Sequence, residues 1–127
     1  TMQAMFGSCS NVSALDVSHF DTSQVTTMYR MFRNCIGITS LDLSNFNTNN
    51  VTNIDNMFYN CKKLTTIYVG NHWTTAKVEE ACDNVFNSDT KLKGGSGTTY
   101  SSSRISKDYA HVDGGASNPG YFTLKTN

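Results

Sequence analysis

The chain has 127 residues, the size of one domain, and its formal net charge at neutral pH is zero. Because neither charge sign is in excess and no basic stripe is present, the sequence argues against a nucleic-acid partner. No apolar run approaches the ~20 residues that a membrane-spanning helix needs, so we expect no transmembrane segment in this chain.

The composition favours a protein that works outside the cell. Only 16% of the residues are charged, whereas about a quarter is usual in soluble domains. Ser, Thr and Asn together make up about a third of the chain. A polar, weakly charged composition of this kind predicts an extracellular location, either at the cell surface or as a secreted protein.

A repeated Met-Phe-x-x-Cys motif is the dominant feature of the sequence. It begins at Met5, Met31 and Met57, and the interval is 26 residues both times (31 − 5 and 57 − 31). A fixed period of about 20 to 50 residues is typical of stacked repeats that bury one another's apolar faces. Thr1-Met2 matches the repeat only approximately, so we expect the chain to begin within a unit.

Each unit contains a short predicted strand, because two apolar residues alternate with polar ones. The apolar pairs are Leu15 and Val17, Leu41 and Leu43, and Ile67 and Val69. The residue between the two members of each pair should point to solvent. We therefore expect one strand per unit with two side chains in the core.

A helical segment is predicted after each strand, because apolar residues recur at i, i+3, i+7 and i+10. The two clearest stripes are Val25, Met28, Phe32 and Cys35, followed by Val51, Ile54, Phe58 and Cys61. Thr48 or Asn49 can cap the second segment, since their side chains accept hydrogen bonds from the first helical amides. A strand and a helical segment per unit predict an α/β fold.

The last unit departs from the period by insertions, and the pattern stops at Gly94. Trp73 takes the place of Phe20 and Phe46, and Val85-Phe86 stands where Met-Phe stood. We expect about four coils over residues 1–93, the first of them truncated. Residues 94–127 should form a C-terminal cap of the same domain, with a helical turn at 107–112 and a final strand at 121–125.

The cysteines allow three interpretations. Cys9, Cys35 and Cys61 share one phase of the repeat and should stack, whereas Cys82 has another phase. A column of small buried residues is the simplest interpretation. A disulfide between adjacent coils needs Cα atoms within about 4.4–6.8 Å. A metal or redox site would want closely spaced pairs such as Cys-x-x-Cys, which the chain lacks.

Other motifs do not add up to a catalytic or cofactor site. Asp21-Thr22-Ser23 matches the tripeptide of aspartic proteases, but its place at a segment start favours capping. Asp108 and Asp113 leave a calcium site open, although no EF-hand ligand pattern is present. The histidines lack metal-binding spacing, and the Gly94–Gly97 stretch lacks the end of a phosphate loop. We expect no enzyme activity, no cofactor and no metal.

Surface positions of the predicted strands are the best candidates for binding. The residues between the apolar pairs form a column, which stacked repeats commonly use as an extended binding face. The candidate residues are Asp16, Asp42 and Tyr68, flanked by Ser18, His19, Ser44 and Asn45. A second candidate face carries Tyr29, Arg30, Arg33, Asp55, Asn56 and Tyr59. Either face could instead be merely solvated.

The stretch "MFRNCIGITSLDLSNFNTNNVTNIDNMF" resembles the 26-residue repeat of BspA-like bacterial surface proteins and mycoplasma lipoproteins. The tail "GGSGTTYSSSRISKDYAHVDGGASNPGYFT" resembles the ending of such arrays. The resemblance implies a right-handed, leucine-rich-repeat-like solenoid on an exported microbial protein. It implies adhesion or protein–protein recognition, with a host matrix protein, another cell-surface protein or a glycan as partner. It supplies no catalytic residues, and a shared fold does not establish which ligand a protein binds.

Two other functions stay open. The domain could be a structural spacer or stalk module of a larger surface protein. It could also be a carbohydrate-binding module, with Tyr29, Tyr59 and Tyr68 stacking on sugars, although the single Trp73 lies at a core position. A contiguous apolar or aromatic surface patch would favour recognition, and uniform Ser, Thr and Asn faces would favour a spacer.

Overall fold

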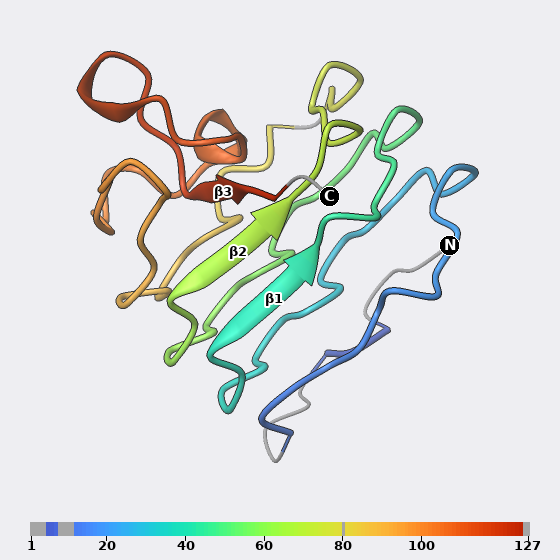
Figure 1. The fold of residues 1–127 in the computed structure, drawn as a ribbon, viewed down its shortest axis with the longest axis horizontal. Helices are drawn as coiled ribbons and strands as arrows, with labels where there is room; N and C mark the ends of the chain where they lie inside the picture. Colours follow the sequence, from blue (N-terminus) through green and yellow to red (C-terminus); the bar gives the residue numbers. More distant parts are fainter. Residues whose placement is uncertain (1–4, 8–11, 80, 126–127) are drawn as a thin grey trace.

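The computed structural model describes residues 5–7, 12–79 and 81–125 (Figure 1). Within these residues it contains three strands, β1 (Ser40–Leu43), β2 (Thr66–Val69) and β3 (Phe122–Leu124). It also contains two 3-10 helices, η1 (Lys107–Tyr109) and η2 (Gly115–Ser117). The strands form one parallel sheet in the order β1-β2-β3. Turns and loops make up most of the described chain.

The repeat period sets the register of the sheet. Leu41 pairs with Ile67, and Asp42 pairs with Tyr68, each at an offset of 26 residues. The apolar members of β1 and β2 are buried, and Asp42, between Leu41 and Leu43, is exposed, as a strand's alternation requires. The strands predicted around Leu41 and Ile67 are present. The strand predicted at Leu15 and Val17 does not form.

The predicted helical segments are wrong, and so is the α/β leucine-rich-repeat-like solenoid that they implied. The described residues contain no α-helix, and residues 29–34 and 55–60 form consecutive turns. Arg30, Asn34, Asn56 and Asn60 have positive φ angles of 59°, 62°, 57° and 63°. A right-handed helix cannot contain such residues, because its φ angles are negative. The spacing of three to four residues arises from repeated turns.

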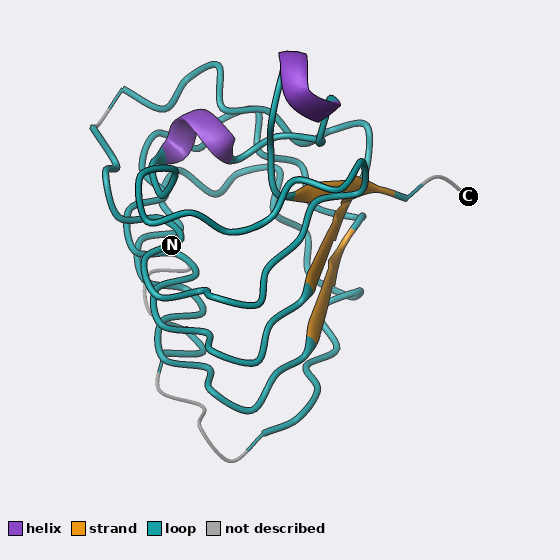
Figure 2. Cartoon of the chain, turned by 90° about the vertical axis from the view of Figure 1, so that its left-hand side faces the viewer, coloured by secondary structure: helices purple, strands orange, loops and turns teal. Residues whose placement is uncertain are grey.

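Hydrogen bonding explains why turns replace the helix. Alternate amides of one coil donate to carbonyls of the next coil, so they cannot close helical bonds within their own segment. The bonds are Arg30 N to Asp55 O, Phe32 N to Met57 O and Asn34 N to Tyr59 O, at 3.1, 2.9 and 2.8 Å. Figure 2 shows these turns stacked on one side of the molecule and the strands on the other. The sheet and the turns thus enclose the core between them.

A stack of phenylalanine rings fills the core along the direction of the repeat. Phe6, Phe32, Phe58 and Phe86 stack in sequence with centroid distances of 5.6, 5.8 and 5.6 Å. Their planes lie within 8° of parallel. Phe32, Phe58 and Phe86 have no exposed surface. Each coil therefore buries its ring against the next one, which no coil could do alone.

The cysteine column runs beside the rings. Cys35 and Cys61 are fully buried. The Cys35 thiol donates to the carbonyl of Phe6 at 3.1 Å, and the Cys61 thiol donates to the carbonyl of Phe32 at 3.2 Å. Cys82 is buried at a different place in the repeat, and Cys9 lies outside the described residues. The described cysteines of the motif are core side chains that tie adjacent coils together.

Residues 94–125 lie against the last coil. Tyr121 packs edge-on against Phe86 at 4.9 Å, and the Phe86 amide donates to the carbonyl of Ile105. The indole of Trp73 donates to the carbonyl of Ala110 at 2.9 Å. Covering the last ring of the stack in this way excludes water from it. The domain boundary at residue 94 stays a prediction.

Candidate functional site

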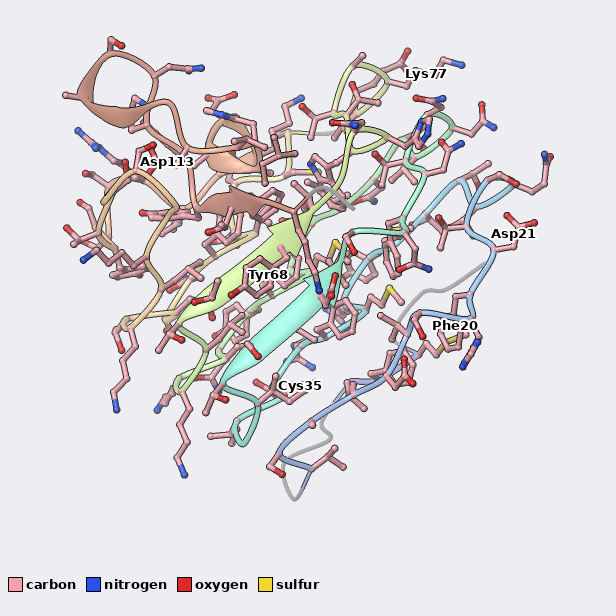
Figure 3. All side chains as sticks on the ribbon, viewed as in Figure 1. Phe20, Asp21, Cys35, Tyr68, Lys77 and Asp113 are labelled. Carbon is pink, nitrogen blue, oxygen red and sulfur yellow. The ribbon has the colours of Figure 1, made fainter. Side chains whose placement is uncertain are left out.

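The sheet places the predicted surface column on one open face. Asp42 and Tyr68 are register partners, and Tyr68 is in turn the partner of Thr123 on β3. Successive outward residues of adjacent strands lie about 4.8 Å apart in a sheet. Figure 3 shows Tyr68 on the viewer's side of the sheet, above the strand arrows. The outward side chains of β1, β2 and β3 therefore form a continuous surface.

Five of the seven predicted face residues line one depression of about 290 Å³ on this surface. These are Asp16, Ser18, Asp42, Ser44 and Asn45. Leu15, Val17 and Lys125 complete the lining. Tyr68 and His19 do not line it, although the Lys125 ammonium that does lies 5.7 Å from the centre of the Tyr68 ring. We call these eight lining residues the sheet-face depression.

The depression lies where the first coil fails to join the sheet. Among the described residues, no backbone hydrogen bond connects 14–17 with β1. Instead, the side chain of Asn45 holds the end of this segment by donating to three backbone carbonyls. Its Nδ2 lies 3.3 Å from Val17 O, 3.0 Å from Ser18 O and 3.2 Å from Phe20 O. The edge of β1 and the segment beside it thus remain separate walls of a hollow.

Hydrogen bonds keep both carboxylates of the depression ionised. The side chain and amide of Ser18 donate to Asp16, and these two bonds lower the pKa of Asp16. Partial burial raises the pKa of Asp42, but hydrogen bonds from Lys125 and Ser44 outweigh it, so the net pKa is lowered. The hydrogen bond to Asp42 raises the pKa of Lys125. At neutral pH the depression therefore carries two negative charges and one positive charge.

Lys125 is the charged member of this site that the sequence did not predict. Its ammonium forms an ion pair with Asp42, 83 positions earlier in the chain. The backbone amide of Lys125 donates to Val69 O, which sets the end of β3 beside β2. The sequence contains no periodic signal for this contact, because the tail lies outside the 26-residue repeat.

Asp113 organises a second polar cluster, whose members do not line the sheet-face depression. Its carboxylate accepts hydrogen bonds from the amides of Ser96, Thr98 and Gly115 at 2.9 Å each, and from the Thr98 hydroxyl at 2.7 Å. Burial raises the pKa of Asp113, but these donors outweigh it and lower the pKa to about 2. Both oxygens of the carboxylate already accept hydrogen bonds, and the hydrogen atoms of these donors point to the place that a cation would occupy. Asp113 is therefore a structural hub.

The other chemical motifs have structural roles too. Asp21 accepts hydrogen bonds from the amide and hydroxyl of Ser23, at 3.0 and 2.7 Å, as a turn residue does. Asp108 is exposed in η1, whose first turn is capped by Ser106. Within the described part of the chain, no three acidic, histidine or cysteine residues form a group that could hold a metal ion.

The second candidate face also contains ordered contacts. The guanidinium of Arg30 lies 4.6 Å from the centre of the Tyr29 ring, and that of Arg33 lies 5.6 Å from the centre of the Tyr59 ring. All four residues are partly buried. Their ring faces are covered by the protein's own cations, which leaves less aromatic surface for a sugar to stack on.

Residues 1–98 match the family described as "Mycoplasma protein of unknown function, DUF285". The chain belongs to this family. The match covers the whole repeat and the first residues after it, and it is consistent with the resemblance to mycoplasma repeats. Searches of curated proteins and of solved structures found no significant match to this DUF285 chain. None of its described helices combines the length and apolar character required to cross a membrane.

Proposed function

We propose that this DUF285 chain is a non-catalytic recognition domain of a BspA-like surface protein, located outside the cell. Its partner is a host matrix protein, another cell-surface protein or a glycan. Family membership supports a mycoplasma-type repeat protein, and the Thr/Asn-rich, weakly charged composition supports an extracellular location.

The observation that carries the proposal is the sheet-face depression. It gathers ionised carboxylates, an ammonium, hydroxyls and an amide around a hollow of about 290 Å³. These groups are held by hydrogen bonds and an ion pair within the protein, so they need little reordering when a partner binds. A preorganised polar hollow on an otherwise continuous face suits recognition better than catalysis.

The spacer function keeps one observation in its favour. The large apolar side chains that the described residues expose come from separate segments of the chain. They are Met5, Val12, Ile36, Val112 and Leu124. A recognition surface of this protein must therefore rely on polar contacts, whereas a stalk module needs no partner at all.

The proposal is tested by binding of the purified chain to an array of matrix proteins and glycans. A triple variant, Asp16→Ala, Asp42→Ala and Tyr68→Ala, removes the outward column of the sheet. The matched control, Asp21→Ala, Asp83→Ala and Lys91→Ala, changes three exposed residues that do not line the depression. Binding that is lost in the first variant and kept in the second supports the proposal. A folded, monomeric chain that binds nothing supports the spacer function.

A further inference from the structure

The repeat provides an internal comparison between two equivalent carboxylates. Asp16 and Asp42 are 26 residues apart and line the same depression. In each, Oδ1 accepts the amide of the serine two residues later, Ser18 or Ser44, at 3.0 Å. The two carboxylates therefore share the same local hydrogen bond at Oδ1, which leaves Oδ2 as the atom to compare.

The two carboxylates differ in what occupies Oδ2. Oδ2 of Asp42 accepts a hydrogen bond from the ammonium of Lys125, which comes from the end of β3. No described residue donates to Oδ2 of Asp16, which remains exposed at the rim of the hollow. One copy of the repeated site thus holds a lysine side chain, and the equivalent oxygen in the neighbouring copy is open to a ligand.

The surroundings show why an ammonium suits this place. Lys125 lies between Asp42 and Tyr68, so a carboxylate and an aromatic ring face the cation together. The depression beside Asp42 is lined by Asp16 as well, so a cation that enters it would meet two carboxylates. The charges of the depression sum to −1 with Lys125 in place, counting Asp16, Asp42 and Lys125. Leu15, a partly buried member of the lining, supplies an apolar contact for the methylene groups of a lysine side chain.

We propose that the sheet-face depression binds a lysine side chain of a partner protein, with its ammonium on Asp16 Oδ2, beside the internal lysine already held by Asp42. This inference rests on the proposed recognition function and names the chemistry that recognition uses. Lys125 opposes this binding, because its ammonium lines the same hollow and places a like charge beside an incoming one.

The experiment is a titration of the full chain with Nα-acetyl-lysine amide at low salt, followed by backbone-amide NMR. We expect the amide signals of Asp16, Ser18, Asp42 and Ser44 to shift. The Nε-acetylated form of the probe has no ammonium and should cause no such shifts. Asp16→Asn should weaken binding about fivefold, the effect of losing one exposed ion pair. Lys125→Ala should strengthen it, because a like charge that lines the hollow is removed.

Asp21→Asn is the matched control. Asp21 forms the same hydrogen bonds with Ser23 that Asp16 forms with Ser18, but it does not line the depression. It should leave lysine binding unchanged. Equal losses in Asp16→Asn and Asp21→Asn, equal shifts with the neutral probe, or no shifts around the depression would each overturn the proposal.

The array experiment separates this inference from the proposed function. If the chain binds a matrix protein and excess lysine amide does not compete, the lysine site is wrong while recognition stands. If lysine amide binds as expected but no array component does, the site stands and the proposed recognition function loses its support.

Discussion

Replacing Asp89 by cysteine should stabilise the protein at neutral pH. Asp89 has no exposed surface, and it occupies the cysteine position of the motif in the last coil, where the sequence is Val85-Phe86-Asn87-Ser88-Asp89. Its Oδ1 accepts the amide of Cys61 at 2.7 Å. Its Oδ2 is buried and has no hydrogen-bond partner. Burial therefore raises the pKa of Asp89 well above its usual value.

The magnitude follows from what the substitution removes and restores. A buried polar atom without a partner costs about 1–3 kcal/mol. In the preceding coils, the carbonyl of Phe32 accepts both the Cys35 amide and the Cys61 thiol. The same geometry offers the carbonyl of Phe58 to the Cys61 amide and to a thiol at position 89. We expect Asp89→Cys to raise the free energy of unfolding by about 1–3 kcal/mol at pH 7.

The pH dependence has a definite sign. The folded pKa of Asp89 is raised, so its contribution to stability is full below about pH 4, the usual pKa of an unfolded aspartate. As the pH rises from there through the folded pKa, the unfolded chain ionises first and stability falls. Between pH 5 and 8, wild-type stability should therefore decrease with rising pH, and this slope should be smaller in Asp89→Cys.

The assay is urea unfolding under reducing conditions, followed by the fluorescence of the single Trp73, which packs on Phe122. Asp83→Cys is the control, because Asp83 is exposed in the same loop. It should change stability by less than about 0.5 kcal/mol. If Asp89→Cys is less stable than wild type throughout this pH range and keeps the same slope, the reasoning about the buried carboxyl is wrong.

Three other predictions concern the cap, the ring stack and the thiols. Asp113→Asn should lower the free energy of unfolding by about 2–4 kcal/mol, because a carboxylate that accepts several hydrogen bonds is lost. Since the folded pKa of Asp113 is lowered to about 2, its contribution is present above about pH 4 and disappears as the pH falls through 2. Thermal melts at decreasing pH should show a shallower loss of stability in the variant than in wild type. Parallel curves would contradict the role of Asp113 as a structural hub. Phe32→Ala should cost ~3–5 kcal/mol in urea melts, whereas Phe20→Ala, at a half-buried ring, should cost less; equal costs would argue against the stack. Burial raises the pKa of the Cys61 thiol, so labelling at pH 8 should be slow in the folded state and fast in urea, and rapid labelling without urea would place this thiol outside the core.

The predicted core was largely recoverable from the sequence. The 26-residue phase placed Phe32 and Phe58 in one column and Cys35 and Cys61 in another, and the structure stacks both pairs. Periodicity was sufficient here because a residue at a fixed phase meets its own equivalent in the next coil. The same phase rule could have shown that Asp89 takes the cysteine position, once the two inserted residues of the last unit were counted.

The local conformation was not recoverable in the same way. A spacing of three to four residues is shared by a helix and by consecutive turns, so the apolar stripe alone could not separate them. Asn34, Asn56 and Asn60 carried a signal for turns, since asparagine tolerates positive φ better than most residues. The amides that donate to the next coil decided the outcome, and such bonds exist only once the coils are stacked.

The sequence by itself determined which apolar side chains of the repeat form the core and in what order they stack, because both follow from a repeat that matches its own neighbours. Tertiary structure alone decided that the first coil stays apart from β1 and that Lys125 lies on Asp42. The first depends on whether backbone hydrogen bonds form between coils, and the second joins residues 83 positions apart, beyond the reach of any local pattern. The depression that these two features create is where recognition by this DUF285 chain can be tested.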